Sequence, residues 1–343
     1  MKTSNDLNVL MLSIGYGGFG GVELGAERLR DWLVKHNIGV MVVASGKSND
    51  IYKVPTLGFW RIFWPIFAYL KSVYIITFKK VDVIYARYAL YPMFLGIILK
   101  LISGKPLVVS IHGGDIRHGF PLRYFISWGL RRADRVICYD NPGHIKEIKK
   151  RGVDPIVIPN GIDTRFFKPS KLKSKIKKVI YVGGTRSIKG WIDIIGLSCR
   201  RRLDRLDDLK FYIYATASMP KSINTVFSNR VEHSEMKNVL ESRQLFILPS
   251  YAEGVPGSLL EAMARGMYVI ASDLDFTRTI FPEKFLFKAG DINRMEELVM
   301  EFYNNKESYF GDQNIKNRKI VVDNYSMDMS GEKWKELFLS LKK

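Results

Sequence analysis

The feature that most constrains this chain is a pattern of short apolar runs alternating with helix-length stretches, which starts twice. The first series has apolar runs at residues 8–14, 40–44, 81–85, 107–112, 135–139 and 155–158. The second series has runs at residues 179–182, 211–215, 245–248 and 268–271. Stretches with helical spacing lie between or after them, at 22–36, from Trp191, at 296–303 and at 333–341. Strands interleaved with helices predict parallel sheets joined by right-handed crossovers, which is an α/β fold.

The length of 343 residues fits two such domains better than one. A lysine-rich stretch at 168–178 is typical of a linker between folding units. We therefore predict an N-terminal Rossmann-like domain over 1–167, completed by a C-terminal helix at 328–343, and a second Rossmann-like domain over 168–327. Two doubly wound parallel sheets facing across a cleft are the expected architecture.

Charge and cysteine content narrow the class of protein. Lys and Arg outnumber Asp and Glu by 53 to 34, so the net charge of +19 attracts polyanions. No helix-turn-helix, zinc-finger or RNP-like motif is present, so nucleic acid is not an expected partner. The two cysteines, Cys138 and Cys199, are too far apart to indicate a disulfide framework or a zinc site. We find no signal peptide and no apolar run long enough to span a membrane, and expect a cytoplasmic protein.

A glycine-rich loop follows the first predicted strand, from Gly15 to Gly21. Glycines between a strand and a helix let backbone N–H groups approach a ligand, and Gly20 and Gly21 stand at the helix start. The alternative is a tight turn with no ligand. The run does not fit the GxGxxG pattern with an acidic residue about 20 positions later, so a dinucleotide is not favoured.

A second strand–loop–helix segment runs from Gly183 to Gly190 and adds two cations. Arg186 and Lys189 could neutralise a diphosphate, although a solvated basic loop would look the same. The Walker pattern is absent.

Two glutamates eight positions apart, Glu253 and Glu261, flank a loop and a helix start. We expect the helix to begin near Ser258 as its N-cap, with Glu261 in the first turn and Glu253 at the end of the preceding strand and loop. Carboxylates here can bind sugar and ribose hydroxyls at the carboxyl edge of a sheet. Glu261 could equally be an ordinary first-turn acid.

His112 follows a strand of apolar residues and precedes two glycines. This position at the carboxyl end of a strand fits a functional histidine as well as a structural one. No second histidine stands at metal-ligand spacing, so no metal site is predicted.

Together these features resemble the family-4 retaining glycosyltransferases of the GT-B fold. The resemblance rests on AEGVPGSLLEAMARGMYVIASD (252–273), on IPNGIDTRFFKP (158–169), and on VDVIYARYALYPMFLGIILKLISGKPLVVSIHGGD (81–115). It implies that Glu253 contacts the transferred sugar near the reaction centre, that Glu261 holds the ribose, and that His112 lies near the donor sugar. Lys189 falls on the family's diphosphate lysine. The resemblance also implies that Gly17 and Gly18, or Gly20 and Gly21, are the first-loop glycines near the donor and the acceptor. It places further donor contacts along the segment between the two glutamates, at Gly254, Val255, Pro256, Gly257, Ser258 and Leu259.

The chain departs from the family pattern at two places. The arginine that usually follows the strand-turn glycine is replaced by Gly184, and Arg186 is the nearest substitute. After Ala271-Ser272-Asp273 the family has two glycines and then a glutamate, whereas this chain has Asp275, Phe276 and Thr279.

The resemblance implies transfer of a sugar from a UDP-, GDP- or other nucleoside-diphosphate sugar, with its anomeric configuration retained. No metal and no other cofactor is expected, since cations and backbone amides replace a metal at the leaving diphosphate. The acceptor would be a glycan or a lipid-linked molecule in cell-surface polysaccharide or glycolipid synthesis. An epimerase or a phosphorylase fits the residues less well. A non-catalytic nucleotide-sugar-binding protein of the same fold is the remaining alternative, because of Gly184 and Thr279.

An aromatic stretch at 57–78 also contains Arg61 and Lys71, with Lys79 and Lys80 next to it. Aromatic rings beside cations favour an interfacial helix at an anionic membrane, on the inner face in a cytoplasmic protein. A helix packed in the first domain with its cations reaching solvent is equally compatible.

Overall fold

The computed structural model describes residues 7–16, 21–46, 51–55, 63–116, 118–169, 177–215, 225–228, 231–241, 243–305 and 311–342. The chain forms two compact units. Unit 1 consists of residues 1–161 and 327–343, and unit 2 consists of residues 162–326. The expected boundary after residue 167 lies within unit 2, where Ile162 and Phe167 are fully buried in the core.

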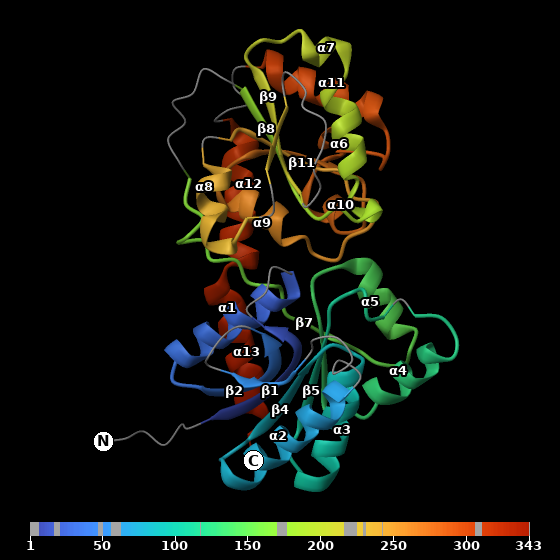
Figure 1. The fold of residues 1–343 in the computed structure, drawn as a ribbon, viewed down its shortest axis with the longest axis vertical. Coiled ribbons are helices and arrows are strands. Elements are labelled where there is room, and N and C mark those ends of the chain that lie inside the picture. Colours follow the sequence, from blue (N-terminus) through green and yellow to red (C-terminus); the bar gives the residue numbers. More distant parts are fainter. Residues whose placement is uncertain are drawn as a thin grey trace. The chain divides into compact units, whose positions relative to one another are not determined.

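Unit 1 is built on a parallel sheet with the order β3-β2-β1-β4-β5-β6-β7 (Figure 1). Its strands are β1 (Asn8–Tyr16), β2 (Gly39–Gly46), β3 (Tyr52–Lys53), β4 (Val83–Arg87), β5 (Leu107–Ile111), β6 (Arg135–Cys138) and β7 (Ile156–Val157). Its helices are α1 (Gly21–Lys35), α2 (Trp64–Phe78), α3 (Tyr91–Ser103), α4 (Leu122–Leu130), α5 (Pro142–Lys149) and α13 (Met327–Leu341). The strand order reverses between β1 and β4, as in doubly wound sheets.

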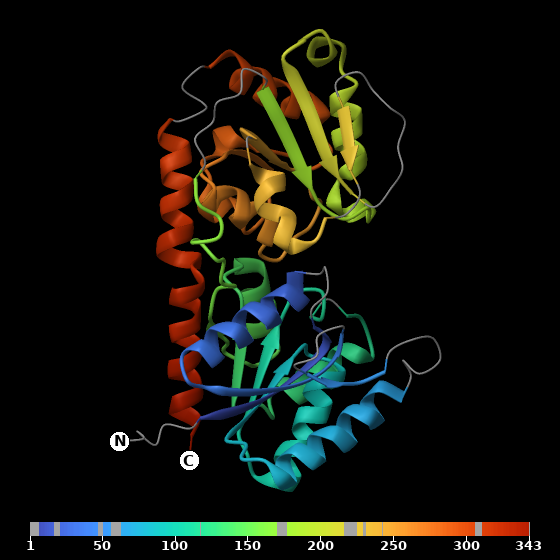
Figure 2. The same ribbon diagram turned by 60° about the vertical axis from the view of Figure 1, so that its left-hand side comes forward.

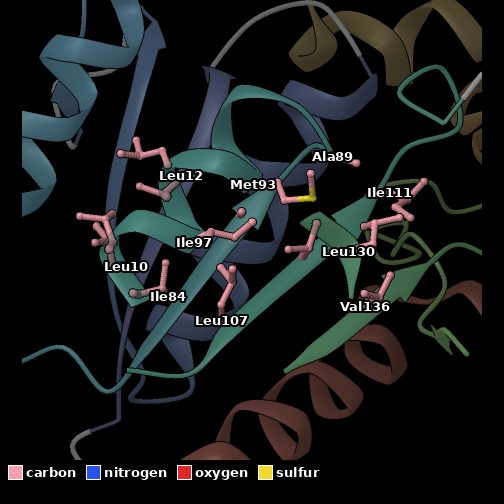
Figure 3. Close-up of a cluster of buried hydrophobic side chains, with 14 of the residues drawn as sticks. Leu10, Leu12, Ile84, Ala89, Met93, Ile97, Leu107, Ile111, Leu130 and Val136 are labelled. Atoms are coloured by element: carbon pink, nitrogen blue, oxygen red, sulfur yellow. The ribbon is translucent and has the colours of Figure 1, made fainter. Parts of the chain in front are cut away.

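Two cores cover the two faces of this sheet. One contains strand residues such as Leu10 and Ile84 with side chains from α2, α3 and α4 (Figure 3). The other joins the opposite strand residues to α1 and α13, with Trp334 and Phe338 buried against Tyr85. Because the central strands are buried on both faces, they are apolar at almost every position.

Helix α13 returns to unit 1 after the whole of unit 2. Trp32 Nε1 of α1 donates a hydrogen bond to Asp328 at 3.0 Å, and Ser330 Oγ donates to the carbonyl of Pro159. Gly331 allows the close approach, because a Cβ atom there would lie 2.2 Å from the Trp32 ring. The C-terminal helix is therefore an integral part of the unit 1 core.

Unit 2 repeats the plan with the parallel order β10-β9-β8-β11-β12-β13 (Figures 1 and 2). Its strands are β8 (Lys177–Val182), β9 (Leu209–Tyr214), β10 (Thr225–Ser228), β11 (Leu245–Leu248), β12 (Tyr268–Ser272) and β13 (Leu286–Phe287). Its helices are α6 (Trp191–Ser198), α7 (Arg201–Asp204), α8 (Met236–Leu240), α9 (Gly257–Ala264), α10 (Thr277–Ile280), α11 (Ile292–Asn304) and α12 (Asp312–Tyr325), with 3-10 turns η2 (Ser187–Lys189), η3 (His233–Glu235) and η4 (Glu283–Phe285). The order reverses between β8 and β11.

The predicted lysine-rich linker is partly wrong. Lys177 and Lys178 are the first residues of β8 and pair with β9. Residues 170–176 lie outside the described part of the chain.

Candidate functional site

The most distinctive side-chain arrangement in unit 2 is an ion pair between Lys189 and Glu253. Lys189 Nζ lies 2.7 Å from Glu253 Oε1 and 2.8 Å from Oε2. The two residues come from the loops that follow β8 and β11, the neighbouring strands at which the strand order reverses. In doubly wound sheets this point, at the carboxyl ends of the strands, is where ligands bind. The structure thus brings together two of the residues that the sequence singled out.

Backbone contacts between the two loops fix this pair. Gly190 follows Lys189 with φ of 65°, and a Cβ atom there would lie 2.1 Å from the carbonyl oxygen of Pro249. Tyr251 N donates to the carbonyl of Ile188 at 2.8 Å. The loops are therefore held against each other by their main chains, which leaves little freedom in where Lys189 and Glu253 sit.

Glu253 has a second partner in its own loop. Ser250, which is buried, donates its hydroxyl to Glu253 Oε1 at 2.7 Å. The Glu253 side chain is 9% exposed and that of Lys189 is 23% exposed, so the pair is largely but not fully removed from water. An anion arriving at this edge would meet a cation that is already engaged by a carboxylate.

The N-cap of helix α9 lies two residues earlier than predicted. Its N-cap is Pro256, with no side-chain hydrogen bond, and Ser258 lies inside the helix, so Ser258 as N-cap is wrong. Extended backbone at Pro256 starts the helix, and its carbonyl accepts from Leu260 N. The amides of the first turn, including those of Gly257 and Ser258, are the donors that a helix start leaves without intrahelical partners.

The positions of Leu259 and Glu261 also differ from expectation. The Leu259 side chain is fully buried in the unit 2 core, so only its main chain can face a ligand. Glu261 lies in the second turn of α9 rather than the first, since no acidic residue occupies the first turn. Gly254 and Val255, which lead into the helix, are partly exposed.

A histidine that the sequence did not single out contacts Glu261. His233 Nε2 lies 3.2 Å from Glu261 Oε1, and the His233 ring stacks on Phe166. The Glu261 carboxylate is nearly buried, so a ribose at this position would have to share or displace His233. His233 and Glu261 are 28 positions apart in the sequence, and this separation gives no sequence signal for the contact.

The loop after β8 exposes its other cation. Arg186 is solvent-exposed ahead of the η2 turn. Gly184 is exposed too, and a Cβ atom there would have nothing within 4 Å. Tyr181 donates its hydroxyl to the Gly184 carbonyl at 3.0 Å, and burial, helped by Glu253, raises the pKa of this tyrosine. The main chain of the loop is held while its side-chain face is open.

The loop after β12, where the chain departs from the family pattern, is closed by its own ion pairs. Arg278 donates to Asp273 at 2.5 Å and 3.0 Å and lies 3.6 Å from Asp275. Phe276 is buried, whereas Thr279 is exposed. The sequence that replaces the family's glycines and glutamate therefore has a local structural role.

In unit 1, His112 lies just after β5 in a network of buried polar groups. Its Nε2 is 3.0 Å from Ser110 Oγ, and its main-chain N–H donates to Asp115 at 2.9 Å. Burial, with the charge of Arg87, lowers the pKa of His112 well below its usual value. His112 is therefore a neutral imidazole, half-buried at the carboxyl edge of the unit 1 sheet.

Sequence reasoning missed the residues behind His112. Tyr85 and Arg87, on β4, are fully buried and connect to Ser110 by hydrogen bonds. The available signal was a charged residue within VIYARY (83–88), a run otherwise typical of a buried strand.

The first glycine loop is only partly open to description. Gly20 lies outside the described residues, as does most of the loop. Gly21 is the exposed first residue of α1, and a Cβ atom there would have nothing within 4 Å. Among the described residues no three His, Cys, Asp or Glu side chains are grouped to hold a metal ion.

The fold and site define an α/β protein whose two units both have Rossmann-like strand order, with a lysine and two glutamates at the carboxyl edge of the second sheet. The family "Glycosyltransferase Family 4" matches residues 19–166, and "Glycosyl transferases group 1" matches residues 162–319. The chain belongs to these glycosyltransferases, and its fold is GT-B.

Known proteins agree with this family. An uncharacterized glycosyltransferase of Methanocaldococcus jannaschii is 26% identical over 330 residues, covering 88% of this chain and 90% of its own. An Escherichia coli UDP-Gal:alpha-D-GlcNAc-diphosphoundecaprenol alpha-1,3-galactosyltransferase is 24% identical over 72% of each chain. The solved sucrose-phosphate synthase of Thermosynechococcus elongatus superposes with a TM-score of 0.81 at 14% identity, covering 98% of this chain and 99% of that one.

Proposed function

We propose that this glycosyltransferase takes its sugar from a nucleoside-diphosphate donor bound at the carboxyl edge of the unit 2 sheet. The observation that carries this proposal is the Lys189–Glu253 pair at the point of strand reversal. A donor supplies a replacement partner for each member. Its diphosphate takes the lysine, and its sugar hydroxyls take the carboxylate.

The chemistry follows from these roles. As the bond between the anomeric carbon and the diphosphate breaks, negative charge builds on the leaving oxygen. Lys189, Arg186 and the first amides of α9 stabilise that charge without a metal ion. Positive charge builds on the sugar, and Glu253 orients the ring and favours that charge. Retention of the anomeric configuration, through attack on the face that the diphosphate leaves, is part of the proposal.

The direct test is release of a nucleoside diphosphate from a panel of nucleotide sugars in the presence of a chelator. Wild type should release one diphosphate, and Glu253→Ala should not. With an acceptor present, NMR of the product reports whether the anomeric configuration is kept. If no diphosphate is released, a raised melting temperature of the protein with one of the nucleotide sugars shows that it binds this donor without turnover. If no nucleotide sugar in the panel releases a diphosphate and none stabilises the protein, the proposal is contradicted.

We further propose that the acceptor is lipid-linked and is met at an anionic membrane, through the outer face of α2, α3 and α4. Helix α2 has two apolar sides. Trp64, Ala68 and Ile75 are buried against the unit 1 core, while Leu70 and Phe78 are exposed. The helix is thus packed in the domain, as one sequence interpretation required, and also presents an outward apolar stripe, as the other required.

The two neighbouring helices extend this stripe. The exposed large apolar residues of the three helices and the turn before α4 are Ile66, Leu70, Tyr74, Phe78, Tyr91, Ile98, Leu101, Ile102, Phe120, Tyr124, Phe125 and Trp128. Phe94 of α3 stacks on Trp128 of α4, so the helices are in contact. Exposed apolar surface on this scale marks an interaction site rather than an ordinary surface.

Charge identifies the partner that this face fits. Helices α2, α3 and α4 contain no acidic residue, and exposed cations at Lys79, Lys80, Arg131 and Arg132 adjoin their ends. Aromatic rings with cations and without acids favour an anionic bilayer surface. The Escherichia coli relative acts, by its name, on a diphosphoundecaprenol-linked sugar. No described helix is long and apolar enough to cross a membrane. We therefore place the enzyme peripherally on the inner face of the membrane, in cell-surface polysaccharide or glycolipid synthesis.

Vesicle sedimentation tests this surface. Leu70→Glu and Leu101→Glu alter side chains that are 58% and 78% exposed, so the fold should tolerate them. Each should weaken binding to vesicles with anionic lipid. Ile315→Glu is the matched control, because Ile315 of α12 in unit 2 is 66% exposed and should have no effect. Equal binding of wild type and both variants would contradict the membrane proposal and leave the donor proposal unaffected.

A further inference from the structure

Arg87, in unit 1, is a fully buried cation. It ends β4 and is 1% exposed. Its Nη1 donates to Tyr85 Oη at 3.1 Å, and its Nη2 donates to the carbonyl of Val22 at 3.0 Å. A hydrogen bond to Tyr139 adds to these. Within the described part of the chain no acidic side chain forms an ion pair with it. Burying a charge without an ionic partner is costly, so we ask what the hydrogen bonds of Arg87 do.

The hydrogen bonds that leave Arg87 have only one possible direction. A guanidinium can only donate, so Tyr85 Oη accepts from Arg87. Tyr85 then uses its own proton to donate to Ser110 Oγ, at 3.0 Å. Burial raises the pKa of both Tyr85 and Tyr139, so neither phenol ionises to neutralise the guanidinium.

The hydrogen bond between Ser110 and His112 determines which ring nitrogen of His112 carries the proton. Ser110 is 0% exposed, so its hydroxyl proton cannot be given to water. Among the described residues, the atom that can accept this proton is His112 Nε2, at 3.0 Å. A buried hydroxyl left without an acceptor is unfavourable, so Ser110 donates to Nε2. The imidazole proton must then be on Nδ1.

Neighbouring groups hold the ring in this orientation. Tyr88 stacks on the imidazole with ring centroids 5.3 Å apart, and its backbone has φ of 110°, which is strained for a tyrosine. Tyr139 packs edge-on against the same ring at 5.0 Å. Asp115 accepts from the main-chain N–H groups of His112 and Ala89. The charged groups in contact with this network are therefore Arg87, which donates to Tyr85, and Asp115, which accepts from the main chain of His112.

We propose that Arg87 is a positioning residue, which acts through Tyr85 and Ser110 to hold His112 as the neutral Nδ1–H tautomer. In this state His112 offers a hydrogen bond from Nδ1 to a substrate oxygen, of a sugar hydroxyl or a phosphate, bound at the carboxyl edge of the unit 1 sheet. It cannot serve as a base through Nε2, which is already occupied. A neutral imidazole also adds no positive charge beside a sugar that becomes cationic in the transition state. The substrate contact rests on the proposed function, whereas the tautomer does not.

Nitrogen-15 NMR of the imidazole rings in the full chain tests the tautomer directly. The five histidines give few signals, and His112→Gln identifies the one from His112. Wild type should show protonated Nδ1 and unprotonated Nε2 below pH 6.5, where an exposed histidine is charged. Ser110→Ala should reduce the ratio of Nδ1–H to Nε2–H about fivefold to tenfold, which is the usual effect of one hydrogen bond.

Further variants test the separate hydrogen bonds of the relay, which runs from Arg87 through Tyr85 and Ser110 to His112. Tyr85→Phe removes only the phenol oxygen and should shift the tautomer in the same direction as Ser110→Ala. Arg87→Gln keeps an amide donor toward Tyr85 but removes the charge, so the tautomer should persist while the pKa of His112 rises. Arg87→Met removes every donor toward Tyr85 and should shift the tautomer in the same direction as Ser110→Ala. An unchanged tautomer in Arg87→Met would remove Arg87 from the relay. Ser72→Ala, which deletes a buried hydroxyl of α2 in the same unit, is the matched control and should change neither. An Nε2–H tautomer in wild type, or unchanged spectra in Ser110→Ala and Tyr85→Phe, would overturn the relay.

Kinetics then tests what the tautomer is for. Ser110→Ala should lower kcat for sugar transfer, by no more than the fivefold to tenfold fall in the tautomer ratio, while KM for the donor changes little, because the lost contact strengthens in the transition state. Loss of the tautomer with an unchanged kcat would overturn the substrate contact of His112 and leave the relay standing. Absence of any transfer in wild type, with the tautomer observed, would place the failure in the proposed function instead.

Discussion

Replacing Glu253 by glutamine should have opposite effects on product binding and on catalysis. Before any ligand binds, Lys189 Nζ is held within 2.8 Å of both Glu253 oxygens. A nucleoside diphosphate must win the lysine from this carboxylate. Glutamine has almost the same shape and can still accept from the Ser250 hydroxyl, but it carries no charge and so holds the lysine less strongly. The diphosphate should therefore bind more tightly to Glu253→Gln, although this variant transfers sugar poorly.

The size of the effect follows from the burial of the pair. Fully exposed pairs contribute up to about 1 kcal/mol, and losing one partner of a buried pair costs about 3–5 kcal/mol. With Lys189 at 23% and Glu253 at 9% exposure, solvent screening reduces the upper value, and we take about 1–2 kcal/mol. This corresponds to roughly 5- to 30-fold tighter binding of the diphosphate. Lys189→Met removes a charged hydrogen bond of about 1.5–3 kcal/mol and should weaken binding roughly 10- to 150-fold.

Titration calorimetry with UDP, GDP and ADP measures these constants for wild type, Glu253→Gln, Lys189→Met and the double variant. In the double variant the gain from glutamine should vanish, because no lysine remains to be released. The coupling between the two sites is thus the quantity to compare. Equal diphosphate binding by wild type and Glu253→Gln, or tighter binding that persists in the double variant, would refute the partner exchange.

Three further predictions concern single positions. Gly184→Arg has open space and ordinary backbone, so it should restore a diphosphate contact and tighten binding about tenfold or more; unchanged titration curves would contradict this. Gly190→Ala combines φ of 65° with a Cβ atom 2.1 Å from the Pro249 carbonyl, so it should lower the free energy of unfolding by about 2–3 kcal/mol in a urea titration. Gly257→Ala is the control, because its Cβ atom meets nothing within 4 Å, and it should change the free energy of unfolding little. His112 has a folded-state pKa well below its unfolded value near 6.5, so the unfolded chain binds more protons and the free energy of unfolding falls as pH drops below about 6.5. His112→Gln should therefore lose less stability than wild type between pH 7.5 and pH 5, and equal losses in the two proteins would contradict a lowered pKa of His112.

The central strands could be predicted from the sequence, whereas of the edge strands only β7 was predicted, by the run at 155–158. Runs such as 245–248 are apolar at every position because both faces are covered, and the structure has β11 at the same residues. Of the missed strands, β3 and β13 have two residues each, too few to form a pattern, and β10 has four. What makes them strands is pairing with β2, β12 and β9, which is tertiary information.

The site was predictable to the extent that it follows strand ends. Lys189 and Glu253 each follow an apolar run, and parallel strands bring their carboxyl ends to one edge. The cap of α9 was missed because Ser258 is a strong N-cap type, while the extended backbone of Pro256 starts the helix earlier. The hydrogen bonds that connect Arg87 to His112 form because β4 pairs with β5. No spacing in the sequence indicates that these two strands are neighbours.

The place of α13 in unit 1 has a consequence for how this protein is made. Unit 1 begins to leave the ribosome first, but the helix that covers one face of its sheet is translated only after residues 162–326. At 5–20 residues per second, that delay is roughly 10 to 30 s. During this interval the site for Trp334 and Phe338 beside Tyr85 remains uncovered. The nascent chain therefore carries an apolar surface that the native protein hides, and its first domain matures only after its second has been synthesised.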